Sequence, residues 1–319
     1  MRSKSHVKDL TFVCPVSHVR TVIQRPCTAI LPCFNHILYD GDKSVVREPA
    51  SRVLSPKKMT RESPTKKKLQ RIVETRQFSR TNREQVQASI SRYMLTNSDS
   101  IGSGNFSKIS GSDLGLLFHV TDEYFFEGNI NRLCEQQADR PLSFRLSTRM
   151  TSAGGMTTMQ TSHDRRNPTR EFEIAIATTP LFATFKDEPT AIVSGIVCRN
   201  RLQALQRIME HEMIHLVEML LWNDSNCAAK PFKRIVNRFF GHTESNHQLL
   251  TPRDLARKRL GISQGDLVTF SRQGQNLTGH VNRITKRATV LVASAKGSMY
   301  DDGRKYVKYY VPLNRLKRA

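Results

Sequence analysis

His211-Glu212-Met213-Ile214-His215 is the stretch from which the fold and function of this chain are inferred. Apolar residues around it recur at spacings of three and four, which predicts a helix. On a helix, His211 and His215 lie one turn apart on the same face, where two imidazoles can bind one zinc ion. Glu212 is adjacent, so its carboxylate can act as general base on a metal-bound water. The apolar flanks indicate a buried helix, which disfavours two solvated surface histidines because buried polar groups need partners.

Length and composition indicate a soluble protein with a substantial core. The chain has 319 residues, enough for one or two domains. It has no apolar run long enough to cross a bilayer, and residues 1–10 lack the apolar segment of a secretory signal. The six cysteines show no CxxC pairing, so a disulfide framework is not expected. We therefore expect an intracellular protein, cytoplasmic or associated with the nucleoid.

The net charge of +22 is concentrated at the two ends of the chain. Residues 1–83 carry 18 Lys and Arg against 6 Asp and Glu, and residues 248–319 carry 15 against 4. Residues 84–247 are nearly neutral, with 17 against 18. Basic flanks attract a polyanion through counterion release and steering. The pattern predicts DNA as a partner, the alternative being a solvated surface with a disordered tail.

The N-terminal half is expected to contain a disordered region followed by two helices. Residues 1–83 form a basic region whose Ser, Thr, Pro and Lys content predicts disorder. One helix is predicted from about Arg83 to Leu95. Asp113 is expected to cap a second helix, whose apolar and aromatic residues continue to Phe125.

Three strands are predicted between these helices and the metal-binding helix. Residues 142–148 and 156–161 are expected to form a hairpin through the turn Gly154-Gly155. Residues 172–178 alternate apolar and polar side chains, which predicts a third strand of an antiparallel sheet. We expect this third strand to be an edge to which an extended substrate peptide can add.

The last part of the chain changes character. A short helix is predicted at 231–240 and another begins near Thr251. Short β-rich runs within residues 261–319 predict a small basic β-barrel of SH3 or KOW type. Basic residues interleave there with tyrosines, a combination suited to single-stranded nucleic acid. The residues concerned are Arg283, Lys286, Arg287, Lys305, Lys308, Tyr306, Tyr309 and Tyr310; by alternation, either Tyr309 or Tyr310 faces the core.

These residues together resemble the SprT-like (Spartan-type) zinc metallopeptidases. The resemblance covers about residues 113–250 and rests on the HExxH motif, the strands before it and the short helix after it. It implies an α+β fold with a minimal zincin-like domain at 84–260, which cleaves proteins attached to DNA. It also implies that His211 and His215 bind zinc and that Glu212 is the catalytic base.

The third zinc ligand departs from the family pattern. The resemblance places a histidine in a Gly-His-Gly-like turn before the short helix, where Phe232 matches the aromatic residue that follows the turn. Here that turn contains Cys227 and no histidine, whereas a Gly-His pair occurs later at His242. His242 is the expected ligand because imidazole suits catalytic zinc, with Cys227 and His247 as alternatives. The metzincin pattern is not met, because Glu218 and Leu221 stand where it needs Gly and His.

Two further points concern the chemistry. Glu218 shares the helix face of His215, so it is a candidate for orienting an imidazole, although a solvated carboxylate is equally consistent with the pattern. No residue stands out as a second donor to the oxyanion; His163, Tyr124 and Arg170 are merely compatible with that role. The function predicted is a zinc endopeptidase acting on DNA-associated proteins, and the alternative is a nucleic-acid-binding protein with a structural zinc.

Overall fold

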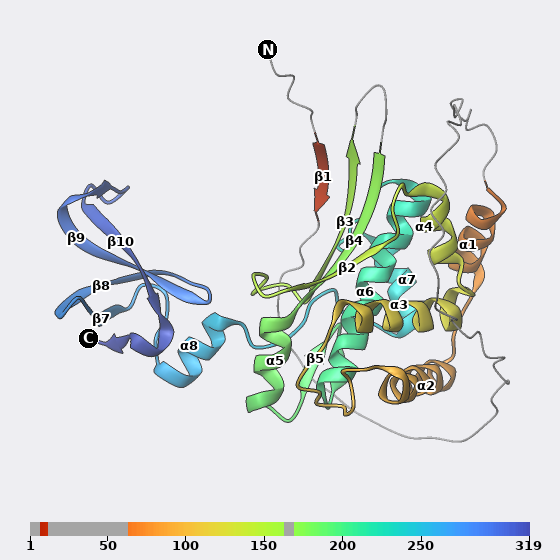
Figure 1. Cartoon of the computed structure of the whole chain (residues 1–319), viewed down its shortest axis with the longest axis horizontal. Coiled ribbons are helices and arrows are strands. Elements are labelled where there is room, and N and C mark those ends of the chain that lie inside the picture. The colour runs from red at the N-terminus through yellow and green to blue at the C-terminus, as the bar shows by residue number, and fades with distance from the viewer. Residues whose placement is uncertain (1–6, 12–62, 163–168) are drawn as a thin grey trace, which may run out of the picture.

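The computed structural model describes residues 7–11, 63–162 and 169–319, which form an α+β protein (Figure 1). The described helices are α1 (Pro64–Thr75), α2 (Arg80–Asn97), α3 (Gly111–Phe126), α4 (Asn129–Gln137), α5 (Thr178–Asp187), α6 (Arg201–Trp222), α7 (Lys230–Phe240) and α8 (Pro252–Leu260). The strands are β1 (Val7–Thr11), β2 (Ser143–Ser147), β3 (Gly155–Ser162), β4 (Thr169–Ala177), β5 (Ala191–Val193), β6 (Ile196–Cys198), β7 (Leu267–Arg272), β8 (Gln275–Ile284), β9 (Arg287–Met299), β10 (Lys305–Pro312) and β11 (Lys317–Arg318). None of the described helices combines the length and apolarity needed to span a membrane.

Helix α6 is the centre of the fold. Nearly every one of its residues is buried, including its polar ones, so it is enclosed on all sides. The side chain of Asn200 caps its first turn by accepting a hydrogen bond from the Gln203 amide, and Asn223 ends it in a left-handed conformation. The predicted metal-binding helix is therefore confirmed, and its burial with it.

The sheet beside α6 has the strand order β1-β3-β4-β2. β3 and β4 pair antiparallel, from Gly155 opposite Ile176 to Ser162 opposite Thr169. β2 pairs with β4 in parallel, so the predicted hairpin between β2 and β3 is wrong. The predicted edge strand is also wrong, because β4 lies between β3 and β2; the segment β1 pairs antiparallel along β3. The period-2 pattern identified the strands but contains no information on their partners.

Helix α1 lies inside the region that was expected to be disordered. Ser63 caps it by accepting from the Lys66 amide, and Pro64 occupies its first turn. Its residues Leu69, Ile72 and Val73 are buried in the main core. Disorder is therefore wrong for this helix, because three apolar residues at helical spacing outweigh a basic composition; the prediction for residues 12–62 lies outside the described residues.

One helix starts earlier than predicted, and another was not predicted at all. Helix α3 begins three residues earlier than expected, with Ser110 as its cap and Asp113 as the third residue of a capping box. Helix α4 was not predicted, and its first-turn amides are capped by Asp122 of α3, whose carboxylate accepts from the amides of Ile130 and Asn131. A cap supplied from another helix has no local sequence signal.

The C-terminal strands form a second, separate unit. β7 to β11 make an antiparallel sheet of order β10-β9-β8-β7-β11, with its own apolar cluster that includes Val268, Phe270, Val281 and Val290. In the part of the chain that the structure describes, β10 and β11 do not pair, so the sheet is open and the predicted closed barrel is not confirmed. Tyr309 packs against Phe270, whereas Tyr310 is 66% exposed. This agrees with the prediction that one of the two tyrosines faces the core.

Candidate metal and catalytic site

His211 and His215 face the same point in space. Their Nε2 atoms are 3.1 Å apart, one helical turn along α6. The ring of Phe232, from α7, covers both imidazoles at centroid distances of 4.9 and 4.5 Å. Burial lowers the pKa of His215 to about 4 and that of His211 well below its ordinary value, so both rings are neutral and suited to metal binding.

A short chain of hydrogen bonds fixes the tautomer of His215. Its Nδ1 lies 2.7 Å from the Ser225 hydroxyl, which in turn donates to Glu218 at 2.6 Å. Because the serine proton is used on Glu218, its oxygen accepts the Nδ1 proton of His215. The Nε2 atom is then left with its lone pair toward His211. Glu218 thus acts on the imidazole through a serine that the sequence did not single out.

Cys227 completes a group that can hold a metal ion. Its Sγ and one ring nitrogen from each of His211 and His215 all lie within 4.8 Å of one another. The loop is held by the Asn226 amide, which donates to Glu218, and by Ser245, which donates to the Cys227 carbonyl. Cys227 is disulfide-bonded in this structure, so its sulfur must be reduced to a thiolate before it binds a metal.

His242, the expected third ligand, faces a different group of side chains. Its Nε2 lies 2.9 Å from Glu210, which also pairs with Arg207 at 2.9 Å. Glu210 and Arg207 are both buried on α6, and neither belongs to the metal-binding group. Burial lowers the pKa of His242 well below its usual value, so the imidazole is neutral. Among the described residues the geometry favours Cys227 over His242 as the third ligand.

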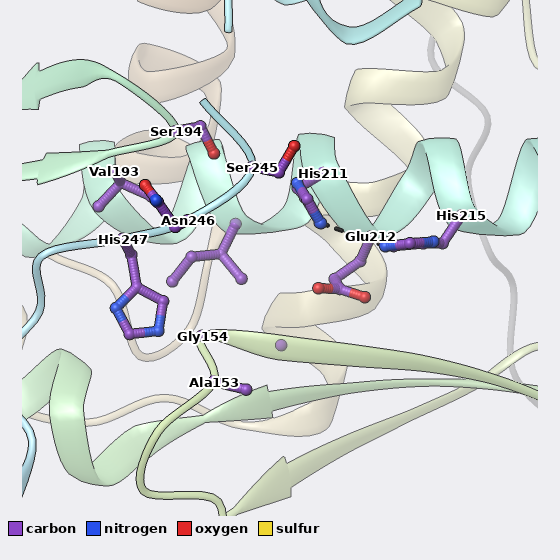
Figure 2. A pocket seen from close by; sticks show the side chains of 12 residues that line it. Ala153, Gly154, Val193, Ser194, His211, Glu212, His215, Ser245, Asn246 and His247 are labelled. Atoms are coloured by element: carbon purple, nitrogen blue, oxygen red, sulfur yellow. Dashed lines mark hydrogen bonds between the residues drawn. The ribbon is translucent and has the colours of Figure 1, made fainter. Parts of the chain in front are cut away.

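Glu212 lies in the same cavity as the two imidazoles (Figure 2). Thr157, from β3, donates its hydroxyl to the carboxylate at 2.8 Å and to the Glu212 carbonyl at 3.0 Å. Burial raises the pKa of Glu212 to about 8, and the bonds from Thr157 oppose that rise. A cation bound beside the carboxylate would favour its charged form further.

Gly154 and Gly155 serve close packing and do not form the turn that was predicted. Neither has a positive φ, and Gly155 begins β3. A Cβ at Gly155 would lie 2.7 Å from Cγ and Oε1 of Glu212. A Cβ at Gly154 would lie 3.0 Å from Cδ2 of His247 and 3.2 Å from Ile208. The two glycines let the backbone of the sheet approach the carboxylate and a third imidazole.

His247 lines this cavity without belonging to the metal-binding group. It is held there because the Ser194 amide donates to the Asn246 carbonyl and the Gln248 amide donates to the Ile192 carbonyl, both at 2.7 Å. Figure 2 shows its imidazole on the same side of α6 as the Glu212 carboxylate, near Gly154.

The other residues considered as oxyanion donors are placed elsewhere or not described. Arg170 donates to the Met219 carbonyl and to Asn223, at the far end of α6. Tyr124 packs against the main core. His163 lies outside the described residues.

No protein-family model matches the chain, and neither curated proteins nor solved structures give a match.

The geometry predicts which substitutions remove the metal. In reduced protein incubated with Zn²⁺ and then gel-filtered, we expect His211→Ala and Cys227→Ala to lose bound metal, measured by mass spectrometry of the metal content. Ser225→Ala should weaken binding by about 10–100-fold, the usual effect of losing a partner that orients a ligand.

His242→Gln is the matched control, because the same residue type is replaced outside the group of three. It should bind metal as the unsubstituted protein does. Loss of metal in His242→Gln together with retention in Cys227→Ala would restore His242 as the ligand.

Proposed function

We propose that this protein is a zinc-dependent endopeptidase of SprT-like type that acts on proteins bound or cross-linked to DNA. The observation that carries the proposal is that two imidazoles line one cavity together with the Glu212 carboxylate, while the sulfur of Cys227, once reduced, can complete a metal-binding group with them. Three protein ligands with room for a fourth group are typical of catalytic zinc sites, whereas structural sites use four.

The donor atoms fit zinc. Two nitrogens each about 2.0–2.1 Å from one tetrahedral zinc ion lie about 3.3 Å apart, and Nε2 of His211 and of His215 are separated by 3.1 Å. The fixed tautomer of His215 presents a lone pair to the ion. When bound, the zinc supplies a Lewis acid that activates water and polarises the scissile carbonyl.

Glu212 is positioned to move the proton. Its carboxylate is held by Thr157 and packs on Gly155, so it cannot swing away from the cavity. It takes a proton from the attacking water and returns it to the leaving amine. Thr157 and Gly155 hold the carboxylate before substrate arrives, which lowers the reorganisation that catalysis requires.

The side of β3 that pairs with β1 is suited to binding an extended polypeptide. β1 pairs antiparallel with it from Val7 opposite Ser162 to Thr11 opposite Thr158. The neighbouring residue of β3, Thr157, donates to Glu212. A substrate strand replacing β1 would use the same backbone groups, which gives affinity without sequence selectivity. This favours protein over a small molecule as the substrate.

The C-terminal sheet supports the choice of DNA. Arg283, Lys286 and Arg287 are exposed at the hairpin that joins β8 to β9. Pro312 of β10 pairs with Arg287, so the exposed Tyr310 lies close to this basic end. A tyrosine ring next to arginines offers stacking for a base and pairing for a phosphate.

A second function is favoured by the thiol at the third position. A thiolate donates more charge to zinc than an imidazole and weakens it as a Lewis acid. In that case the zinc is structural and the protein only binds nucleic acid. The exposed basic hairpin serves either function, so catalysis by Glu212 decides between them.

Replacing the base tests the peptidase directly. In Glu212→Gln, cleavage of a basic protein cross-linked to a DNA oligonucleotide should fall by about 10²–10⁴-fold, the usual contribution of general acid–base catalysis. Metal content should be unchanged. Undiminished cleavage by this variant would reject the mechanism, and absent cleavage by the unsubstituted protein with intact DNA binding would favour the structural-zinc alternative.

Adding one methyl group at Gly155 should displace the Glu212 carboxylate. Because the new Cβ would lie 2.7 Å from Oε1, we expect Gly155→Ala to lose activity by about 10²-fold, as small misplacements of catalytic groups do. Gly102→Ala is the control, since a Cβ there meets nothing within 4 Å. Equal activity in both variants would mean that the carboxylate tolerates the shift.

The basic hairpin should set the salt dependence of DNA binding. Replacing Arg283, Lys286 and Arg287 with Gln should lower the slope of log K against log salt by about 2–3, at about 0.9 per phosphate contact. Lys108, Lys230 and Lys233, exposed outside the C-terminal sheet, provide a control with the same charge loss. Equal effects of the two triple variants would assign binding to net charge alone.

A further inference from the structure

His247 carries a buried hydrogen-bond donor that the proposed chemistry has not yet used. Its side chain is 5% exposed, and its Nε2 finds no hydrogen-bond partner in the part of the chain that the structure describes. Burying a donor without a partner destabilises a fold, so such groups in a native structure need an explanation. A catalytic role is one of the established explanations for such a buried, unpaired donor.

The hydrogen bonds of the ring identify the atom that carries the proton. Nδ1 of His247 accepts from the Leu249 amide at 3.3 Å. A neutral imidazole has one N–H, so the proton is on Nε2. Burial lowers the pKa of His247 to about 4, which keeps the ring neutral at neutral pH. His247 therefore presents a neutral N–H donor.

The cavity that His247 lines is the one that contains the reacting groups. It is bordered by His211, Glu212 and His215 on α6 and by Gly154 at the start of β3. Its volume of about 30 Å³ exceeds the roughly 10–15 Å³ that one water molecule needs. An oxygen atom held here would occupy a cavity that both the Glu212 base and the His247 donor line.

The backbone holds the donor in place. The residue pairs with Val193 of β5 in an isolated antiparallel bridge, flanked by the bonds of Asn246 and Gln248 to the same segment. Its ring lies close to Gly154, where an added Cβ would be 3.0 Å from Cδ2. A donor held by secondary structure before the reaction is the arrangement that stabilises developing charge most efficiently.

Resting on the proposed peptidase function, we propose that His247 is a catalytic residue whose Nε2–H binds the oxyanion formed on the scissile carbonyl. Water adds to the carbonyl carbon while Glu212 takes its proton, and the carbonyl π electrons move onto the oxygen beside His247. The C–N bond then breaks, and Glu212 returns the proton to the departing amine. Water and peptide are consumed, and an acid and an amine result.

The test uses His247→Phe, which keeps a ring at this position and removes the donor. We expect kcat on a quenched fluorescent peptide library to fall by about 10²–10³-fold, as it does when one oxyanion donor is lost. KM and metal content should change little. The melting temperature should fall only modestly, because the loss of the unpartnered Nε2 donor offsets part of the cost of leaving the Leu249 amide without its acceptor. His247→Gln, which retains an N–H donor, should recover part of kcat.

Each other outcome has a definite meaning. Unchanged kcat in His247→Phe overturns the proposal. Loss of metal in this variant makes His247 a ligand and overturns it as well. A lower melting temperature with unchanged kcat assigns the imidazole to structure, bonded to a buried water.

A measurement without turnover separates this proposal from the proposed function. The zinc-loaded proteins are titrated with a phosphonamidate dipeptide, whose tetrahedral anionic phosphorus group resembles the transition state. Weaker binding to His247→Phe by a similar factor supports the donor role even where no peptide is cleaved, while that lack of cleavage rejects the peptidase function. Equal affinities overturn the donor role.

Discussion

The burial of α6 is the constraint on which the rest of the structure depends. A helix enclosed on all sides can carry polar side chains only if each one finds a partner, because an unsatisfied buried group costs about 1–3 kcal/mol. α6 nevertheless carries His211, Glu212, His215 and Glu218. Ser225 and Thr157 supply bonds to three of these four. The surroundings of the helix are therefore built around its polar residues.

The same constraint separates two polar groups on α6. On one side, Glu210 links Arg207 to His242 and so fixes the chain just after α7. On the other, the imidazoles of His211 and His215 converge beneath Phe232. In the first group, Glu210 bonds to both Arg207 and Nε2 of His242, while Nδ1 of His242 has no hydrogen-bond partner among the described residues. In the second group, two imidazole nitrogens and a cysteine sulfur lie close together, which makes it the better candidate for binding a metal ion.

Small residues control how closely the sheet approaches the site. Gly154 and Gly155 allow the start of β3 to contact His247 and Glu212 directly. A Cβ at either position would lie within 3.0 Å of one of these side chains, so the side chain or the sheet would have to shift. Charge stabilisation is stronger in a cavity with little water, because the effective dielectric constant is lower. The C-terminal sheet, which carries the exposed basic hairpin, is a separate unit with its own apolar cluster.

The sequence alone determined whatever depends on neighbours within one helical turn or along one strand. The spacing of His211 and His215, the position of Glu212 beside them and the extent of α6 follow from the 3.6-residue period. The period of two found the strands at 142–148 and 172–178, whereas β1, β5 and β6 were not predicted. Tertiary structure decided which strands pair, that β4 is central, and that Cys227, rather than His242, forms a possible metal-binding group with the imidazoles. These outcomes depend on contacts between segments far apart in the chain, such as Thr157 with Glu212 and His242 with Glu210, which no local pattern encodes.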